Sequence, residues 1–495
     1  MTAQEALKTY FGYDSFRPGQ DTVVSALLSG RDALAIMPTG AGKSLCYQIP
    51  ALLLPGLTLV ISPLISLMQD QVKGLSAAGI PAAYINSALT ENQIAKALQL
   101  AAQGSYKIIY VAPERLESPT FQSFAASAEI SMLTVDEAHC ISQWGQDFRP
   151  SYLRILDFID SLPRRPIVSA FTATATREVK DDIAQTLRLR DPEIVITGFD
   201  RPNLYYRVET TRRKDAFVAD YVRSHPGESG IIYCATRKNV DAVQEMLRSE
   251  DIPAARYHAG MTNEERRQSQ NDFIYDTAPV IVATNAFGMG IDKSNVRYVI
   301  HYNMPQSMEN YYQEAGRAGR DGLSSQCILL FSPQDIMINR FLLEHKEVDD
   351  LDDEAAELLR ERDNQRLQAM ANYCQTTGCL RNYILRYFGE EPAAPCGSCG
   401  NCDRVYAETD MTAQAKWMIN CVAETHGRYG KGVVLNTLRG ANMARLRELG
   451  AMDYRSYGKL KDCTREELNC LLAQLLEDGY LIQTDDQYAV LRMGN

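Results

Sequence analysis

Short apolar runs alternate with longer amphipathic stretches through the first part of the chain. The runs lie at 32–37, 57–62, 107–111, 132–135 and 167–171 and are rich in β-branched residues. Runs of this length, separated by stretches with helical spacing, are typical of buried parallel strands joined by crossover helices. The pattern therefore predicts an α/β domain, which we place at 1–200.

The same alternation starts again after Asp200, Arg201, Pro202 and Asn203. Apolar runs at 230–234, 279–284, 297–302 and 326–331 predict a second α/β domain, placed at 201–335. A charged, helical pattern then leads to a cysteine cluster, and we place a helical domain at 336–408. Its acidic run, 347–357, is expected to be the solvated start of a helix, because acidic side chains favour helix N-termini.

The last segment, 409–495, is expected to be a small helical domain with a β-wing. Thr464 and Glu467 form a capping-box pattern ahead of an apolar face made by leucines 468, 471, 472 and 475. Gly479 is expected to end this helix. Short apolar runs at 480–483 and 488–491 predict a hairpin whose tip holds Asp485 and Asp486.

Composition narrows the class of protein. The chain has 495 residues, too many for one hydrophobic core, and its apolar runs are shorter than a membrane span needs. Without an export signal at the N-terminus, we expect a cytoplasmic protein. The net charge of -11 argues against coating DNA by bulk electrostatics, so nucleic-acid contacts should depend on local basic and aromatic residues.

A glycine-rich segment follows the first predicted strand and precedes an apolar helix. Its glycines let backbone N–H groups converge on phosphate oxygens, while Lys43 can reach the outer phosphates of ATP and Ser44 can hold Mg²⁺. The full pattern has glycine where this chain has methionine, but the flanking strand and helix support it. The segment consists of Met37, Pro38, Thr39, Gly40, Ala41, Gly42, Lys43 and Ser44.

An acidic motif, Asp136-Glu137-Ala138-His139, follows the apolar run 131–135. It should lie at the carboxyl edge of the sheet, where α/β folds bind ligands. Asp136 is suited to bind Mg²⁺, directly or through water, and Glu137 to orient or deprotonate the attacking water. The alternative is a surface turn with two acids. With the glycine-rich segment upstream, the motif indicates an ATP-hydrolysing motor.

These motifs, together with others in the same order, resemble the RecQ family of DNA helicases in helicase superfamily two. The resemblance covers nearly the whole chain and implies two tandem RecA-like parallel-sheet lobes, then a helical zinc-binding domain and a winged-helix domain. The further segments that carry it are 11–13, 16–20, 62–64, 112–115, 172–175, 283–292, 313–321, 380–390, 429–432, 438–440 and 457–458.

The resemblance also implies roles at the nucleotide. Tyr13 would stack on the adenine, and Arg17 and Gln20 would hydrogen-bond it. Arg320 would be the arginine finger that the second lobe directs at the γ-phosphate, with Arg317 beside it. In related NTPases such a finger is worth about 10³ to 10⁵ in rate.

The segment 140–150 resembles the aromatic-rich loop that follows the acidic motif in this family. Trp144, one of two tryptophans, could stack on bases together with Phe148, while Arg149 touches phosphate. The competing interpretation is that Trp144 and Phe148 pack in a core. The full set of residues expected to contact DNA or to couple it to hydrolysis is His139, Gln143, Trp144, Phe148, Arg149, Thr172, Thr174 and Thr284.

Four of the twelve cysteines predict a metal site. Cys379, Cys396, Cys399 and Cys402 are separated by sixteen, two and two residues, a spacing that suits tetrahedral zinc with a structural role. An iron-sulfur cluster is the alternative. Cys374 lies nearby, but the resemblance selects Cys379. The other cysteines are expected to be small apolar residues: Cys46, Cys140, Cys234, Cys327, Cys421, Cys463 and Cys470.

The expected function is that of an ATP- and Mg²⁺-dependent helicase that moves 3′ to 5′ on single-stranded DNA and unwinds duplexes in repair and recombination. We expect a nucleoid-associated monomer whose partners include single-strand-binding and other repair proteins, and no membrane. An RNA helicase, or a zinc-stabilised DNA-binding scaffold with a decayed ATPase, is the alternative.

Two features depart from many members of the family. The acidic wing tip would repel phosphate, so the wing is not expected to split strands. The sequence also ends after the winged helix, where many relatives continue into another helical DNA-binding domain, so it is either truncated or a short form of bacterial type.

Overall fold

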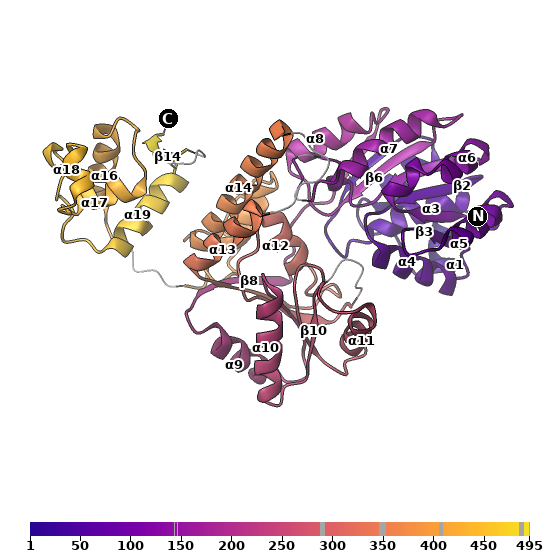
Figure 1. Cartoon of the computed structure of the whole chain (residues 1–495), viewed down its shortest axis with the longest axis horizontal. Helices are drawn as coiled ribbons and strands as arrows, with labels where there is room; N and C mark the ends of the chain where they lie inside the picture. Colours follow the sequence, from indigo (N-terminus) through magenta and orange to yellow (C-terminus); the bar gives the residue numbers. More distant parts are fainter. Residues whose placement is uncertain are drawn as a thin grey trace. The chain divides into compact units, whose positions relative to one another are not determined.

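The computed structural model describes residues 1–142, 144–145, 147–287, 293–345, 353–404, 409–484 and 490–494 (Figure 1). Contacts divide the chain into two compact units. The first is Met1–Ala371 with Arg381–Gly400, and the second is Asn372–Leu380 with Asn401–Asn495. Both predicted α/β lobes belong to the first unit. Among the described helices, none is both long and apolar enough to cross a membrane.

Lobe 1, indigo to magenta in Figure 1, is built on a sheet whose strands pair in the order β3-β4-β2-β5-β6-β1-β7, each described pairing being parallel. The strands are β1 Ala33–Ile36, β2 Leu57–Ile61, β3 Ala82–Ile85, β4 Ile108–Val111, β5 Ile130–Val135, β6 Ile167–Thr172 and β7 Glu193–Ile196. Every expected strand is confirmed. Two edge strands, β3 and β7, were not predicted, because each is short and only partly buried.

The helices of lobe 1 connect these strands. They are α1 Ala3–Phe11, α2 Gln20–Leu28, α3 Lys43–Leu53, α4 Ile65–Ala77, α5 Glu91–Ala102, α6 Pro119–Ser127, α7 Pro150–Ser161 and α8 Arg177–Thr186, with 3-10 turns η1 Pro113–Glu117 and η2 Ala138–Ile141. For the site, α3 matters most, because it begins at the lysine of the glycine-rich segment.

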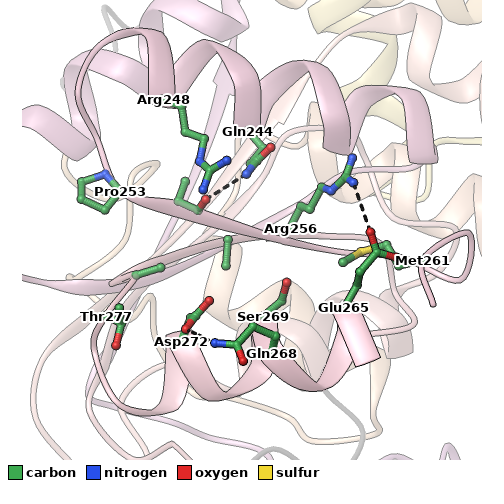
Figure 2. A pocket seen from close by; sticks show the side chains of 13 residues that line it. Gln244, Arg248, Pro253, Arg256, Met261, Glu265, Gln268, Ser269, Asp272 and Thr277 are labelled. Carbon is green, nitrogen blue, oxygen red and sulfur yellow. Dashed lines mark hydrogen bonds and ion pairs between the residues drawn. The ribbon is translucent and has the colours of Figure 1, made fainter. Parts of the chain in front are cut away.

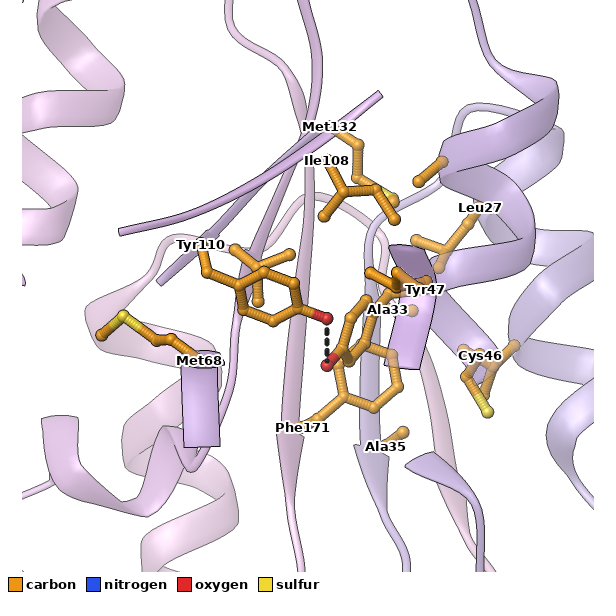
Figure 3. Close-up of a cluster of buried hydrophobic side chains, with 14 of the residues drawn as sticks. Leu27, Ala33, Ala35, Cys46, Tyr47, Met68, Ile108, Tyr110, Met132 and Phe171 are labelled. Carbon is orange, nitrogen blue, oxygen red and sulfur yellow. Dashed lines mark hydrogen bonds between the residues drawn. The ribbon is translucent and has the colours of Figure 1, made fainter. Parts of the chain in front are cut away.

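The core of lobe 1 holds α3 against the sheet (Figure 3). The ring of Tyr47, on α3, meets that of Phe171 edge to face at 5.3 Å between centroids. Its hydroxyl lies 3.4 Å from the hydroxyl of Tyr110, so the two buried polar atoms can satisfy each other. Cys46, the residue before Tyr47, packs against the side chain of Met37. Packing against the core therefore fixes the start of α3 on the side of the helix that faces the sheet.

Lobe 2 repeats the plan with strand order β10-β11-β9-β12-β13-β8, again with parallel pairings. Its elements are β8 Leu204–Thr210, α9 Lys214–Ser224, β9 Ser229–Tyr233, α10 Arg237–Ser249, β10 Ala254–Tyr257, α11 Asn263–Ile274, β11 Val280–Ala283, β12 Val296–His301, α12 Met308–Ala315 and β13 Ser325–Phe331. The four predicted strands are confirmed. The edge strands β8 and β10, which mix polar with apolar residues, were not predicted.

A cavity of about 360 Å³ lies along the edge strand β10, between α10 and α11 (Figure 2). Gln244 closes part of the strand edge by donating to the Ala254 carbonyl at 3.0 Å. Arg256 spans the cavity to Glu265 at 3.9 Å and also binds Asp241 at 2.6 Å. The Gln244 bond satisfies a backbone carbonyl that an exposed edge strand would otherwise offer to another chain.

Beyond lobe 2 the chain is helical, as predicted, with α13 Pro333–Glu344, α14 Asp353–Gln375 and α15 Leu380–Tyr387. The acidic run is described only from residue 353, where α14 begins, and residues 347–352 lie outside the described part.

The second unit contains the predicted small domain, with α16 Thr412–Glu424, α17 Lys431–Leu438, α18 Ala444–Glu448, η3 Ala451–Asp453, α19 Arg465–Glu477, β14 Leu481–Gln483 and β15 Leu491–Met493. The Thr464 capping box is confirmed, and Gly479 has the left-handed φ of 76° that ends α19. Leu468, Leu472 and Leu475 are buried in its core.

The hairpin is confirmed, because β14 and β15 pair antiparallel. Within the described residues, β15 runs from Leu491, whose side chain is fully buried, to Met493, so it extends beyond the predicted end of the strand at Leu491. Tyr488 and Ala489, the first residues of the predicted strand, lie outside the described residues. Asp485 and Asp486, the predicted wing tip, lie outside the described residues.

Asp32, which precedes β1, gives a test of how lobe 1 is held together. Its carboxylate is 3% exposed and accepts hydrogen bonds from Arg165, from the Val168 N–H at 2.9 Å and from the Arg190 N–H at 2.7 Å. Asp32→Ala leaves these donors unpaired, so we expect the free energy of unfolding to fall by about 3 to 5 kcal/mol. Urea denaturation measures the loss.

The matched control is Asp160→Ala, which breaks the exposed ion pair with Arg188 in the same lobe. It should cost less than about 1 kcal/mol. Equal losses in the two variants would show that the buried carboxylate has no special role.

Candidate functional site

A cavity of about 390 Å³ collects residues from the predicted nucleotide motifs of both lobes. Its lining includes the predicted residues Tyr13, Arg17, Gln20, Thr39, Gly40, Gly42, Lys43, Ser44, Asp136, Glu137, Arg317 and Arg320, together with Leu7, Ser15, Leu45, Leu67, Gln71, Ala173, Ser294 and Gln313. Motifs from opposite ends of the first 320 residues, such as those of Tyr13 and Arg320, therefore meet around one space.

The glycine-rich segment forms a loop that opens into α3. Gly40 and Gly42 have φ values of 84° and 79°, in the left-handed region that glycine adopts without strain. Gly42 is the N-cap of α3, so the unpaired N–H groups of the first helical turn lie at the loop, as anion binding requires. Lys43 is partly buried and donates to the Met37 carbonyl at 3.1 Å.

Met37 explains why the first glycine of the pattern is dispensable. Its side chain is 1% exposed and packs in the core of lobe 1, away from the cavity. Pro38 and Ala41 also do not contribute to the lining. Glycine is thus required where the backbone has a positive φ, and in this loop Gly40 and Gly42 stand at those two positions.

Asp136 and Glu137 follow β5 directly. Asp136 is only 7% exposed, which excludes the alternative of a solvated surface turn. Burial, and next the charge of Glu137, raise the pKa of Asp136, while Lys43 opposes the shift. Glu137 has a left-handed φ of 48°, and its Oε2 takes no hydrogen bond within the described structure, although it lies 3.4 Å from His139 Nδ1. A buried Asp136 beside a partly buried Glu137 fits a divalent cation, with Ser44 on the same cavity as a further oxygen ligand.

The residues expected at the adenine also line the cavity. Tyr13 is half exposed, with its side chain available at the surface. The Gln20 amide donates to the carbonyls of Ala41 at 2.8 Å and Gly42 at 3.1 Å, and Arg17 donates to the Gly40 carbonyl. Their contacts in this structure are therefore with the loop, and their contacts with a base stay a prediction.

Arg317 and Arg320 reach the cavity from lobe 2. A Cβ placed on Gly40 would lie 3.4 Å from Cγ of Arg320, so the arginine packs directly over the phosphate loop. Burial lowers the pKa of Lys43, and the nearby charge of Arg320 lowers it further, while Glu137 and Asp136 raise it. The positive charges of the two arginines thus lie where the negative charge of a bound phosphate group would offset them.

A chain of hydrogen bonds leads from the acidic motif to lobe 2. His139 Nδ1 lies 2.9 Å from Thr172 Oγ1, which donates to the Thr174 carbonyl at 3.0 Å. Gln313 then donates to Thr174 Oγ1 at 3.0 Å. The pattern 172–175 therefore does lie between the acidic motif and the second lobe. Thr284 is buried at the end of β11, where its N–H donates to the Tyr257 carbonyl.

The aromatic segment leaves η2 and returns to α7. Trp144 is 46% exposed, so the interpretation of this residue as core packing is wrong; Phe148 is half-buried. The Trp144 N–H donates to Ser142 Oγ, which in turn donates to Asp182 at 2.6 Å. Arg149 binds Asp147 and the Pro63 carbonyl. Gln143 lies outside the described residues.

Two arginines of α14, which the sequence did not single out, hold the Trp144 loop. The Arg362 guanidinium lies 3.5 Å from the centroid of the Trp144 ring, and Arg366 donates to the Trp144 carbonyl at 2.6 Å. Both are largely buried. Their only signal in the sequence is a spacing of four, which puts them on one helix face; the charged stretch otherwise suggests a solvated helix.

The four predicted metal ligands also come together. The Sγ atoms of Cys379, Cys396, Cys399 and Cys402 all lie within 4.8 Å of one another. Thiolates this close fit one tetrahedral zinc ion, which binds sulfur at about 2.3 Å. Cys374 is buried outside this group, so the choice of Cys379 is confirmed.

The remaining cysteines follow the prediction with one exception. Burial raises the pKa of the Cys46 thiol to about 12, and Cys140, Cys234, Cys327 and Cys421 are also buried. Cys463 is partly buried. Cys470 is exposed on α19, so its assignment as an apolar packing residue is wrong.

Comparisons with known families account for almost the whole chain. Residues 17–182 match the DEAD/DEAH box helicase model, and residues 213–322 match the helicase conserved C-terminal domain. Residues 333–403 match the RecQ zinc-binding model and residues 406–495 the RQC domain.

Individual relatives agree. The chain is 45% identical over 490 residues to the ATP-dependent DNA helicase RecQ of Bacillus subtilis (strain 168), covering 99% of this chain and 82% of that protein. It is 40% identical over 489 residues to the protein of the same name from Pasteurella multocida (strain Pm70), covering 99% and 76%. In fold, it is similar to the DNA-bound DUF1998 helicase MrfA, with a TM-score of 0.58 at 19% identity over 78% of this chain and 54% of that one.

With two motor lobes around one nucleotide cavity, a four-cysteine group and full-length relatives, the chain belongs to the RecQ family of ATP-dependent DNA helicases.

Proposed function

We propose that the protein couples ATP hydrolysis to 3′-to-5′ movement on single-stranded DNA and thereby unwinds duplexes during repair and recombination. The observation that carries the proposal is the shared cavity, in which lobe 1 supplies the phosphate loop and two carboxylates and lobe 2 supplies two arginines. A hydrolysis site divided between two lobes changes its contacts when the lobes move, which is what a motor needs.

Each residue of the cavity has a distinct task in this proposal. The loop N–H groups and Lys43 bind the phosphates, and Glu137 orients the attacking water and accepts its proton. Arg320, assisted by Arg317, stabilises charge on the transferring phosphate. Mg²⁺ held by Ser44 and Asp136 would neutralise phosphate charge when bound.

The coupling of hydrolysis to DNA would run through the residues that follow Glu137. His139 belongs to the hydrogen-bonded chain that reaches Gln313 in lobe 2, and five residues further on Trp144 presents its ring at the surface. A base stacked on Trp144 would thus change the position of the segment that contains Glu137. Phe148 and Arg149 would extend the contact to a neighbouring base and phosphate.

We also propose the remaining architecture and partners. The division would be motor lobes at 1–200 and 201–335, a zinc-binding domain at 336–408 and a duplex-binding winged helix at 409–495. Zinc on the four cysteines would be structural. We propose a monomer that works at the nucleoid, where its substrate is, together with single-strand-binding and other repair proteins.

Unwinding of tailed duplexes tests the motor. With ATP and Mg²⁺, we expect the wild-type protein to unwind a 3′-tailed DNA duplex and to leave a 5′-tailed one intact. Glu137→Gln should still bind ATP, since the carboxylate acts on water, but should lower hydrolysis by about 10² to 10⁴ and abolish unwinding. Strand separation and phosphate release measure the two activities.

Glu117→Gln, an exposed carboxylate elsewhere in lobe 1, is the matched control and should behave as wild type. Unwinding of the 5′-tailed duplex alone would reverse the proposed polarity. Preference for an otherwise identical RNA duplex would favour the RNA helicase instead, and DNA binding without ATP hydrolysis would favour the scaffold.

Trp144→Ala tests the link to DNA. We expect lower affinity for single-stranded DNA, because a stacked base contributes about 1 to 3 kcal/mol, and a smaller ratio of DNA-stimulated to basal ATPase. The control is Tyr275→Ala, which removes an aromatic side chain that is 74% exposed on lobe 2. An unchanged ratio in Trp144→Ala would remove this residue from the coupling path.

Cys399→Ser tests the zinc site, because Cys399 is the fully buried member of the group. We expect loss of bound zinc, measured by elemental analysis, and a lower melting temperature, since structural zinc contributes folding free energy. Cys470→Ser, an exposed cysteine outside the group, should keep both. Iron in the wild-type protein, or full zinc content in Cys399→Ser, would contradict the assignment.

A further inference from the structure

Arg201 lies in the segment that joins the two lobes, between the end of β7 and the start of β8. Its guanidinium donates four hydrogen bonds, all to backbone carbonyls. Nη1 donates to Thr39 at 3.2 Å and to Gly316 at 3.3 Å. Nη2 donates to Ala318 at 3.0 Å and to Gly319 at 3.1 Å. One acceptor belongs to the phosphate loop and three belong to the segment that carries the two arginines.

These acceptors surround the point where the two motifs touch. A Cβ on Gly316 would lie 3.7 Å from the Thr39 side chain, and one on Gly40 would lie 3.4 Å from Arg320. Gly316 immediately precedes Arg317, and Gly319 immediately precedes Arg320. The carbonyls that Arg201 binds are therefore those of the peptide units that set the direction of both arginine side chains.

The segment around Arg201 is itself fixed. Arg381 pairs with Asp200 at 2.9 Å and donates to the Leu204 carbonyl at 2.7 Å, one on each side of Arg201. Asn203 donates to the carbonyls of Gly319 at 2.9 Å and Leu323 at 3.0 Å. Residues before and after Arg201 in the sequence are thus held by hydrogen bonds of their own. The position of the Arg201 guanidinium therefore depends on these contacts as well as on its own four hydrogen bonds.

Only arginine meets these demands. Its planar group presents several N–H donors in a fixed fork, and a hydrogen bond from a charged donor contributes about 1.5 to 3 kcal/mol. A lysine carries its donors on one nitrogen and cannot reach acceptors on both sides at once. A purely electrostatic role would not require this shape.

We propose that Arg201 is a positioning residue for ATP hydrolysis, which holds the backbone of Arg317 and Arg320 in register with the phosphate loop. The inference rests on the proposed roles of those two arginines. Arg201 itself does not line the nucleotide cavity, so it acts through them. Its bond to Thr39 crosses from the linker to lobe 1, and its other bonds tie the linker to lobe 2.

The test compares Arg201→Ala and Arg201→Lys with the wild-type protein. We expect both to lower kcat for DNA-stimulated ATP hydrolysis by about 10- to 100-fold, the effect of a misplacement near 1 Å. KM for ATP and the affinity of nucleotide-free protein for single-stranded DNA should stay at wild-type values, because Arg201 does not line the nucleotide cavity and its four donated hydrogen bonds all go to backbone carbonyls. A loss of folding alone would instead lower the fraction of protein that binds single-stranded DNA by the same factor as kcat, which the binding stoichiometry measures.

Asn203→Ala is the matched control, since it removes two hydrogen bonds to the same lobe-2 segment without reaching Thr39. It should keep most of kcat. An equal loss in Asn203→Ala would show that general support of that segment, rather than the tie to the phosphate loop, is what matters, and would overturn the proposal. Wild-type kcat in Arg201→Lys would overturn it as well, and this variant keeps the charge if Arg201→Ala fails to fold.

Arg320→Ala, measured in parallel, separates this inference from the proposed function. Full activity in Arg320→Ala would refute the finger assignment whatever Arg201 does. Loss of activity in Arg320→Ala with wild-type kcat in Arg201→Ala would leave the finger in place and refute the positioning role.

Discussion

The structure depends on bringing positive charge from one lobe against the phosphate loop of another. Lys43, Arg317 and Arg320 line one cavity, and without phosphate they repel one another. Asp136 and Glu137 offset part of that repulsion, although burial, and after it the charge of Glu137, raise the pKa of Asp136. The phosphates of a nucleotide would supply negative charge between these cationic side chains, so nucleotide binding would stabilise the arrangement.

Much of what surrounds the cavity keeps these charges in place. The core under α3 fixes the loop, and left-handed glycines give it its shape. On the other side, the linker residues Arg201 and Asn203 hold the segment of the arginines through backbone carbonyls. The backbone that carries the two arginines is therefore held by hydrogen bonds to neutral carbonyl groups, so its support does not depend on further acidic side chains in the site.

The sequence predicted those parts of the fold and site whose causes are local. Central strands such as β2 and β4 are apolar at nearly every position because both faces are covered, and their runs were visible. The edge strands β3, β7, β8 and β10 are short or alternate with polar residues, so no run marked them. The loop, the acidic motif and the cysteine group were predictable because their chemistry dictates spacing.

Contacts between distant segments were not predictable in this way. Arg201 binds carbonyls, and every residue has one, so no side-chain pattern marks its partners. Arg362 and Arg366 appear as charges on a long helix and become recognisable only when α14 is seen against Trp144.

The Arg362 guanidinium on the Trp144 ring has a thermodynamic consequence for the loop. A base that stacks on the covered face must take the place of a cation already there, so the two ligands compete for one aromatic surface. The measured affinity then reports the difference between two stacking energies rather than the full value of either. A nucleic acid also carries phosphates, which would give the displaced guanidinium a new partner close by. The exchange would break the contact between Arg362 and Trp144 and form one between Arg362 and a phosphate.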